Sequence, residues 1–417
     1  MQHIIIGAGP AGVVAAETLR KCDADAAIAI IGDEPEPPYS RMAIPYYLID
    51  NVKESGTYLR EPKKHFAEQN IEVVQQRVDK VDTKKKEVTL ADGKTRGYDK
   101  LLIATGSHPV SPPIPGLDLP QVHSCWTLED SRNIIKLAQS GSNVVLIGAG
   151  FIGCIILEAL VKRGVNLTVV ETGNRMVPRM LDDKAGGLLE TWCKQQGIDV
   201  HTSCSVESIA AGDGDQVDVS LSDGGKLSAA LVITATGVKA NIDLLEGTGI
   251  ETDFGVLVNK RMQSSDPDVY AAGDVAQGVD FSTGNFEVQA IQPTATDHGR
   301  IAALNMAGKG DEHHGTLNMN VLDTVGLISC SFGLWMGVDG GDSAELYNPD
   351  AFQYINLQFD GNLLVGASAV GKTQHVGVLR GLIESKIDLA KWKDRLMADP
   401  TVVMEAYIAS TQELGYS

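Results

Sequence analysis

Two stretches of the chain share one pattern that decides the fold, His3-Ile-Ile-Ile-Gly7-Ala-Gly9-Pro-Ala-Gly12 and Asn143-Val-Val-Leu-Ile-Gly148-Ala-Gly150-Phe-Ile-Gly153. Each begins as an apolar run typical of a buried strand, passes through a Gly-x-Gly-x-x-Gly turn and continues as a helical sequence. The same order of elements therefore occurs twice, which predicts two related β-α-β modules.

The sequence after each glycine turn supports this reading. A second apolar run follows and ends near an acid, which is Asp33 or its neighbour Glu34 in the first copy and Glu171 in the second. A later apolar run in each copy ends in Ala-Thr-Gly, at Ala104-Thr105-Gly106 and at Ala235-Thr236-Gly237. A glycine-rich loop alone is weak evidence, but this context is present in both copies.

The spacing has a physical reason. The first glycine makes a tight turn, the second lets the backbone approach a pyrophosphate, and the third lets helix and strand pack closely. The helix N-terminus offers unpaired N–H groups to the phosphates, and the acid accepts hydrogen bonds from the adenosine ribose. We therefore expect two bound dinucleotides. Glu171 would repel the 2′-phosphate of NADP, which favours NAD in the second module, although Arg175 could weaken this preference.

Composition excludes several classes of function. The 417 residues carry a formal net charge of −19, which makes nucleic acids and anionic membranes poor partners. The apolar runs are too short for a membrane span, and no signal peptide is visible. Six scattered cysteines lack zinc-like spacing, and the adjacent His313 and His314 are poorly placed to share one ion. We expect free thiols, no metal site and a reducing cytoplasm.

The order GAGPAG, ATG, GAGFIG, ATG and Val269-Tyr-Ala-Ala-Gly273-Asp274-Val-Ala resembles the FAD-dependent pyridine nucleotide–disulfide oxidoreductase superfamily over essentially the whole chain. The resemblance implies FAD in the first module and NAD in the second. The implied FAD-binding residues are Gly7, Gly9, Ala11, Gly12, Asp33, Glu34, Arg41, Val78, Ala104, Thr105, Gly106, Gly273, Asp274, Gln292, Pro293 and Thr294. The implied NAD-binding residues are Gly148, Gly150, Phe151, Ile152, Gly153, Glu171 and Gly237.

The expected fold class is α/β, with two Rossmann-like domains and a small C-terminal α+β interface domain. We expect the FAD domain to be split, at 1–113 and 243–312, around an NAD domain at 114–242, with the C-terminal domain at 313–417. The segment Gly366-Ala-Ser-Ala-Val-Gly371-Lys372-Thr373 fits the P-loop pattern, but its place in the small C-terminal domain favours a plain turn.

Departures from the family pattern narrow the chemistry. Related disulfide reductases and NADH oxidases have a redox cysteine where this chain has Met42, and a thioether forms neither a thiolate nor a disulfide. Many relatives also pair a lysine near the flavin with a glutamate, positions that align here with Tyr46 and Ile155. Glu158 lies one turn further on and is a weak substitute, so we assign no catalytic acid or base.

Without a cysteine relay, the resemblance implies an NAD(H):acceptor oxidoreductase that passes electrons directly to an iron–sulfur protein or subunit. Arg41-Met-Ala-Ile-Pro-Tyr-Tyr47 and Gly377-Val-Leu-Arg-Gly-Leu-Ile383 are similar to flavin subunits of NAD-linked 2-oxoacid dehydrogenase complexes of the phenylglyoxylate type. The alternatives are a free-standing rubredoxin or ferredoxin reductase, an H2O2-forming NADH oxidase, or a non-enzymatic flavin- and NADH-binding scaffold. We expect a hetero-oligomeric complex or a homo-oligomer.

Overall fold

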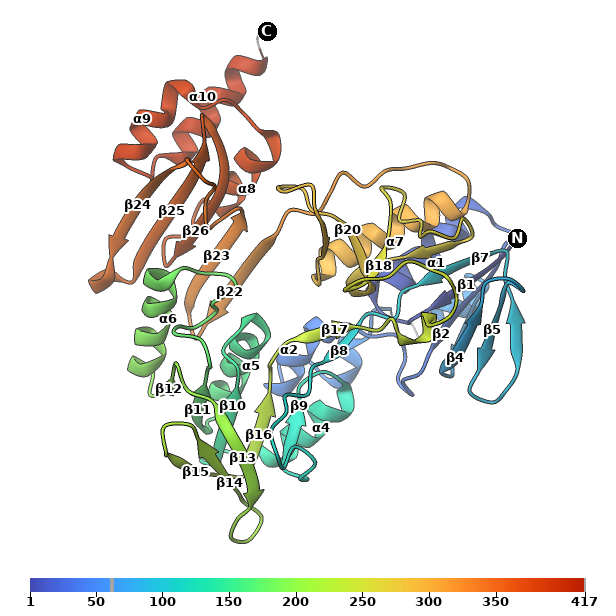
Figure 1. The fold of residues 1–417 in the computed structure, drawn as a ribbon, viewed down its shortest axis with the longest axis horizontal. Helices are drawn as coiled ribbons and strands as arrows, with labels where there is room; N and C mark the ends of the chain where they lie inside the picture. The colour runs from blue at the N-terminus through green and yellow to red at the C-terminus, as the bar shows by residue number, and fades with distance from the viewer. Residues whose placement is uncertain (61–63, 416–417) are drawn as a thin grey trace. The chain divides into compact units, whose positions relative to one another are not determined.

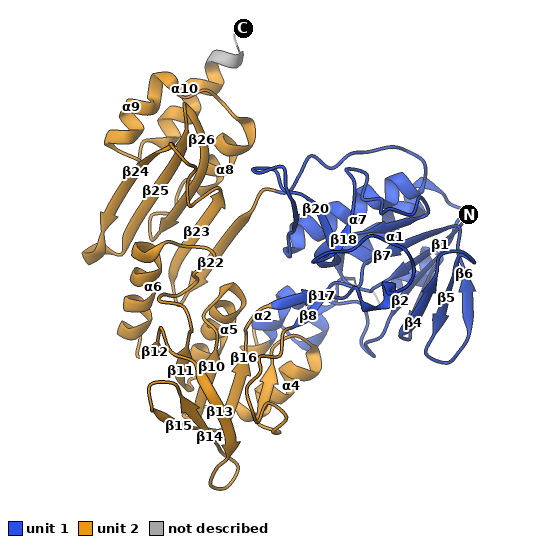
Figure 2. Cartoon of the chain, in the orientation of Figure 1, with its two compact units in different colours: residues 1–47, 52–109, 238–316 blue, residues 48–51, 110–237, 317–417 orange. Residues whose placement is uncertain are grey.

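The computed structural model describes residues 1–60 and 64–415, which form two compact units (Figure 2). Unit 1 comprises Met1–Tyr47, Val52–Pro109 and Val238–Thr316, and unit 2 comprises Leu48–Asn51, Val110–Gly237 and Leu317–Ser417. Each unit has its own sheets and its own buried side chains.

Unit 1 is built around a five-stranded parallel sheet in the order β19-β7-β1-β2-β3. The consecutive side chains Ile4 and Ile5 of the inner strand β1 are both fully buried, so both faces of the sheet are covered, as parallel sheets require. The strands are β1 (Gln2–Ile6), β2 (Ala27–Gly32), β3 (Ile71–Gln75), β7 (Lys100–Ile103) and β19 (Val269–Ala271).

Helices α1 (Pro10–Cys22) and α7 (Gln292–Met306) of unit 1 pack against each other (Figure 1). Helix α1 begins within the glycine motif, directly after its N-cap Gly9, and proline suits the first helical position. The close packing depends on Gly299 of α7, where a Cβ would lie 2.3 Å from the carbonyl oxygen of Ala11. This packing holds the N-terminal ends of both helices in fixed positions.

Smaller elements complete unit 1. An antiparallel sheet consists of β4 (Val78–Asp82), β5 (Glu87–Leu90) and β6 (Thr95–Gly97). A mixed sheet consists of β18 (Val256–Leu257), β20 (Ala276–Val279) and β21 (Phe286–Val288), in which β18 and β20 are parallel and β20 and β21 antiparallel. The remaining elements are β8 (Ser107–Pro109), β17 (Val238–Ala240), α2 (Ile44–Leu48), which ends in unit 2, α3 (His65–Glu68), and the 3-10 helices η1 (Arg41–Ala43), η2 (Glu54–Thr57), η3 (Asp243–Leu245) and η4 (Gly273–Val275).

Unit 2 repeats the parallel sheet in the order β12-β11-β10-β16-β9. The parallel strands are β9 (Val122–Ser124), β10 (Asn143–Ile147), β11 (Asn166–Val170), β12 (Asp199–His201) and β16 (Leu231–Thr234). The helices of this part are α4 (Leu128–Leu137), α5 (Phe151–Lys162) and α6 (Asp183–Gln195), and an antiparallel sheet consists of β13 (Val206–Ala211), β14 (Val217–Leu221) and β15 (Lys226–Ala229).

The C-terminal part of unit 2 is an antiparallel sheet in the order β22-β23-β26-β25-β24 that packs against helices (Figure 1). The strands are β22 (Met319–Thr324), β23 (Leu327–Gly333), β24 (Asp342–Asn348), β25 (Gln353–Asp360) and β26 (Leu363–Val370). The 3-10 helix η5 (Pro349–Ala351) precedes β25, and α8 (Val376–Ser385), α9 (Ala390–Ala398) and α10 (Val403–Gly415) follow β26. The predicted fold class, two Rossmann-like modules and a small C-terminal α+β part, is confirmed.

The turn predicted for the P-loop-like segment is wrong over most of its length. Residues from Gly366 to Val370 continue strand β26, and a Cβ at Gly366 would lie 2.1 Å from the carbonyl oxygen of Leu334. The strand ends at Val370, and Gly371, with φ of +65°, is the first residue outside it. Gly366 is therefore required by close packing of the backbone, and the segment cannot form a phosphate loop.

Candidate dinucleotide sites

The three glycines of the turn in unit 1 differ in whether the fold requires them. A Cβ at Gly7 would lie 2.0 Å from the carbonyl oxygen of Ala104, and one at Gly12 would lie 2.1 Å from that of Gly7. Gly7 also has a φ of +117°. A Cβ at Gly9 would meet nothing within 4 Å, and its φ of −79° is open to any residue. The fold therefore demands Gly7 and Gly12, while Gly9 keeps open space at the N-terminus of α1.

The glycine turn of unit 2 repeats this division. Cβ atoms at Gly148 and Gly153 would lie 2.5 Å and 2.1 Å from the carbonyl oxygens of Ala235 and Gly148, respectively. At Gly150 nothing lies within 4 Å, and this residue is the N-cap of α5 with a φ of −74°. Both turns thus fit a pyrophosphate, because each has an open cradle in front of unpaired helix N–H groups.

In unit 1 the two acidic candidates lie in different surroundings. Asp33 is exposed, whereas the carboxylate of Glu34 accepts hydrogen bonds from the Tyr39 hydroxyl at 2.5 Å and from Arg41 at 2.7 Å. Arg41 also donates to the Tyr39 hydroxyl at 2.7 Å. Arg41 is therefore held by the chain itself, on the segment that follows β2.

In unit 2 the single acidic candidate is buried. Glu171 follows β11, and its two carboxylate oxygens accept hydrogen bonds from the backbone N–H groups of Ala149 at 2.6 Å and Gly173 at 2.7 Å. The first of these bonds ties the carboxylate to the glycine turn. Arg175 points elsewhere, because it donates to the carbonyl of Leu181 at 2.8 Å and pairs with Asp183 at 2.7 Å.

Asp274 is largely buried within unit 1. Burial raises the pKa of its carboxyl above the usual range, although a hydrogen bond from Ser107 at 2.8 Å opposes the shift. The preceding Gly273 has a φ of +79° and lies close to helices α1 and α7. A Cβ at Gly273 would lie 3.3 Å from the Cβ of Ala11 in α1 and 3.4 Å from the Cβ of Ala295 in α7. Unit 1 therefore brings Asp274 together with two helix N-termini.

Other predicted residues lie in the same unit. Thr105 and Asn241 exchange two hydrogen bonds at 2.8–2.9 Å, and Ala104 N–H donates to the Ile6 carbonyl at 2.7 Å. Gln292, at the start of α7 and followed by Pro293 and the buried Thr294, accepts a hydrogen bond from Ser40 at 2.5 Å. Val78 is buried at the start of β4, Gly106 has a φ of +66°, and in unit 2 Gly237 has a φ of +112° while Phe151 and Ile152 open α5.

Within the described part of unit 1, no cysteine lies beside the glycine turn. Cys22 is the only cysteine of that unit, and it ends α1, at the other end of the helix from the glycine turn. In unit 2 burial raises the pKa of the Cys125, Cys193 and Cys330 thiols to about 12. Such thiols stay protonated and unreactive at neutral pH.

The positions that depart from the family pattern carry no acid–base pair. Met42 is 48% exposed in η1 and Tyr46 is 56% exposed in α2. Ile155 is half-buried on α5, and Glu158 forms an ion pair with Lys162 at 2.5 Å. Glu158 is thus engaged on its own helix.

The sequence reasoning missed a buried histidine in α7. Both ring nitrogens of His298 lack a hydrogen-bond partner among the described residues, and burial lowers the pKa of His298 to about 3. Its ring contacts that of His313 at 4.6 Å between centroids. A histidine inside a helical run has no local signal that announces such a contact.

Within the part of the chain that the structure describes, no helix is both long and apolar enough to span a lipid bilayer.

Comparison with known proteins confirms the predicted resemblance. The chain belongs to the pyridine nucleotide-disulphide oxidoreductase family, whose sequence model matches residues 1–299. It is 31% identical over 418 residues to the NADH-dependent phenylglyoxylate dehydrogenase subunit epsilon of Aromatoleum evansii, with 98% of each chain covered. It is 29% identical to the ferredoxin–NAD(+) reductase component of the anthranilate 1,2-dioxygenase system of Burkholderia cepacia, over 97% of this chain and 98% of that one.

The fold is shared with solved structures. The crystal structure of the covalent putidaredoxin reductase–putidaredoxin complex matches with a TM-score of 0.89 and 24% identity, over 98% of this chain and 99% of that one. The family binds FAD, and the chain is an NADH-dependent flavin oxidoreductase of the ferredoxin-reductase type.

Proposed function

We propose that the chain moves a hydride between NAD(H) and FAD and exchanges single electrons with an iron–sulfur partner. The observation that carries this proposal is the position of Met42 together with the cysteines. Met42 stands where related enzymes have a redox cysteine, and the only cysteine of unit 1 ends α1, away from the glycine turn. Electrons therefore cannot leave through a thiol at the position of Met42. FAD, when bound, supplies the step from a two-electron hydride to single electrons.

Unit 1 is proposed to hold FAD, within residues 1–113 and 243–312. Gly9 leaves room for the pyrophosphate at the N-terminus of α1, and Asp33 or Glu34 would reach the adenosine ribose. Asp274 would hold the ribityl chain, and the N-terminus of α7 would lie against the flavin ring. Arg41, already paired with Glu34, would lie near the phosphates.

Residues 114–242 are proposed to hold NAD(H), and 313–417 to form an interface domain. Gly150 leaves the corresponding room for the second pyrophosphate. NAD is favoured over NADP because the buried Glu171 would repel a 2′-phosphate. Arg175 cannot offset this charge without leaving Asp183 and the carbonyl of Leu181.

We further propose that the chain is the flavin subunit of an NAD-linked 2-oxoacid dehydrogenase complex of the phenylglyoxylate type, in which electrons flow toward NAD⁺. The relative from Aromatoleum evansii is by name a subunit of a phenylglyoxylate dehydrogenase, and the match covers 98% of each chain. The net charge of −19 also opposes transient docking on acidic ferredoxins and favours a permanent partner with a complementary surface.

A free-standing NADH–ferredoxin reductase is the second candidate. The relative from Burkholderia cepacia supports this candidate, because that protein is a ferredoxin–NAD(+) reductase component and the match covers 98% of it. The two candidates share hydride transfer between nicotinamide and flavin, and they differ in how the iron–sulfur partner is held and in the direction of electron flow.

The test is an anaerobic titration of the purified flavoprotein with NADH, followed by flavin absorbance. We expect bleaching at one equivalent, fast oxidation by an added iron–sulfur protein, and slow oxidation when air is admitted. Fast oxidation by air would instead indicate an H2O2-forming oxidase. Absence of bleaching in flavin-loaded protein would contradict hydride transfer and leave a binding scaffold.

A second measurement separates the complex subunit from the free reductase. The native protein is sized from its source cells, and its fractions are assayed for iron, labile sulfide and 2-oxoacid-dependent reduction of NAD⁺. Elution of iron, labile sulfide and the 2-oxoacid-dependent activity in the same fractions as the chain supports the complex. A chain that elutes alone and still reduces a ferredoxin supports the free reductase.

A further inference from the structure

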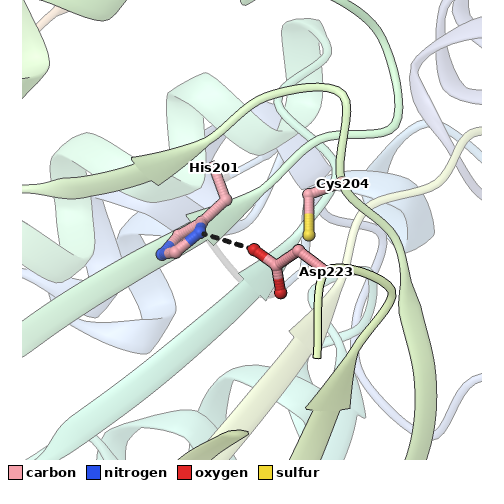
Figure 3. A group of neighbouring side chains, drawn as sticks. All are labelled: His201, Cys204 and Asp223. Carbon is pink, nitrogen blue, oxygen red and sulfur yellow. Dashed lines mark ion pairs between the residues drawn. The ribbon is translucent and has the colours of Figure 1, made fainter. Parts of the chain in front are cut away.

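A histidine, a cysteine and an aspartate meet at the end of β12 in unit 2 (Figure 3). His201 is the last residue of β12, Cys204 follows three residues later, and Asp223 lies in the tight turn between β14 and β15. One ligand atom from each residue lies within 4.8 Å of the others, and His201 Nδ1 is 3.9 Å from Asp223 Oδ2. The three side chains come from two segments of the chain and converge on one point.

The histidine is already oriented as metal-binding histidines are. Its Nε2 lies 2.9 Å from the carboxylate of Asp199, two residues earlier on the same strand. In metal sites the ring nitrogen that does not bind the metal usually contacts a carboxylate in this way, which fixes the tautomer and the ring orientation. The contact with Asp199 directs Nδ1 toward Asp223.

The aspartate and the cysteine are positioned by independent contacts. Asp223 Oδ1 accepts a hydrogen bond from the backbone N–H of Gly225 at 2.8 Å, which leaves Oδ2 available. The sulfur of Cys204 accepts a hydrogen bond from the Ser222 hydroxyl at 3.8 Å.

The loop that carries Cys204 is anchored to the strand end beside it. The backbone N–H of Cys204 donates to the carbonyl of Glu171 at 3.0 Å, and that of Ser203 donates to the carbonyl of Gly173 at 2.7 Å. Ser203 has a φ of +54°, an uncommon conformation for a residue other than glycine. These contacts set the direction of the loop without any ligand.

We propose that His201, Cys204 and Asp223 bind a divalent transition metal of the zinc class, with Asp199 as a positioning residue. An imidazole nitrogen, a thiolate and a carboxylate form a typical zinc donor set, whereas the sulfur disfavours magnesium and calcium. Zinc bonds of about 2.0–2.3 Å require the ligand atoms to approach by roughly 1 Å from their present limit. Three protein ligands leave one coordination position for water.

The exposure of the residues gives the ion a route to the site. Cys204 is buried, whereas the side chains of His201 and Asp223 are 29% and 55% exposed. The ion would therefore enter from the side of the aspartate and reach the sulfur last. The site lies outside both glycine turns, and its loop is anchored to the backbone of Glu171.

The test uses the flavin-loaded full chain after removal of metal with a chelator and desalting. Cobalt(II) is titrated as a probe, and its d–d absorption is recorded at the red end of the visible spectrum, where oxidised flavin does not absorb. We expect one cobalt per chain, intense bands of four-coordinate geometry with a thiolate ligand, and loss of these bands when zinc is added. Less than half an equivalent bound, or six-coordinate weak bands, would overturn the proposal.

Variants assign the ligands. Cys204→Ser and His201→Gln are expected to lose the cobalt bands, and Asp199→Asn to weaken affinity about 10- to 100-fold while the three ligands remain. Matched controls are Cys22→Ser, His123→Gln and Asp218→Asn, which should bind cobalt as the parent does. Unchanged binding in Cys204→Ser or His201→Gln would refute the assignment. Should either variant fold poorly, as judged by flavin content, the exposed Asp223→Asn must still lower affinity about 10-fold or more.

Discussion

Replacing Gly150 by alanine tests whether this glycine exists for a ligand or for the fold. In the protein alone the added Cβ meets no atom within 4 Å, and the φ of −74° suits alanine. Alanine is a poorer N-cap than glycine, but it also lowers the entropy of the unfolded chain, and the two effects are each on the order of 1 kcal/mol with opposite sign. We therefore expect a free energy of unfolding close to that of the parent.

The cost should appear in NADH binding. A methyl group at Gly150 stands where the pyrophosphate must approach the N-terminus of α5, and it would lengthen the hydrogen bonds from the helix N–H groups. One such bond to a charged group contributes about 1.5–3 kcal/mol. Since each 1.4 kcal/mol corresponds to about a tenfold change in affinity, the KM for NADH should rise about 10- to 100-fold.

The assay combines steady-state NADH oxidation, using a dye as acceptor, with flavin content and thermal unfolding. Gly150→Ala should keep its flavin and its Tm and lose only NADH affinity. The control is Gly153→Ala, in which the Cβ would lie 2.1 Å from the carbonyl oxygen of Gly148, so the protein should lose stability. An unchanged KM in Gly150→Ala would refute the reasoning, and so would a Gly153→Ala protein as stable as the parent.

Three further predictions concern Glu171, Asp274 and Met42. Glu171→Gln leaves one acceptor oxygen for the two backbone N–H groups that the carboxylate now binds. The free energy of unfolding should therefore fall by about 1–3 kcal/mol in denaturant unfolding. The preference for NADH over NADPH, measured as the ratio of the two KM values, should become smaller. Burial raises the pKa of Asp274 in the folded protein, so its charged form lowers stability at pH 7. Asp274→Asn should therefore raise the Tm of the flavin-free protein at pH 7, while flavin retention weakens. A Tm series over pH should show this stability gain shrinking as the pH falls toward 3.8. Met42→Leu should retain NADH-dependent dye reduction within about twofold, because the 48% exposed thioether takes part in no redox step, and a tenfold loss would contradict the absence of a role.

Local signals account for the parts of the fold that the sequence predicted well. Strands β1 and β10 are short apolar runs that end in glycine turns. The third glycine of each turn is required by a close contact with the carbonyl of the first. The first glycine of each turn is required by a close contact with the residue that follows a neighbouring strand. The error at Gly366–Val370 has the opposite origin. The place of the segment in the small C-terminal domain favoured a turn, but the neighbouring strand and the carbonyl of Leu334 determine a continuous strand.

Long-range contacts account for what the sequence did not reveal. His201 and Cys204 are separated by two residues, a spacing that alone does not indicate a metal site, and Asp223 comes close to them only through the antiparallel turn between β14 and β15. The contact between His298 and His313 similarly depends on a loop that returns to α7. Side chains that meet through a hairpin or a returning loop leave no periodic trace in the sequence.

The glycines show why sequence and structure answer different questions about one motif. All six positions of the two turns look alike in the sequence, yet four of them are excluded from bearing a Cβ by atoms of the protein. At Gly9 and Gly150 no protein atom would clash with a Cβ, and the φ of each residue suits alanine. The fold therefore does not require glycine at these two positions, and a ligand that occupies the space of a Cβ would account for it. In both units that open position faces the N-terminus of a helix, where the chemistry of an anion fits, so the two glycines themselves argue for a phosphate-bearing ligand in each unit.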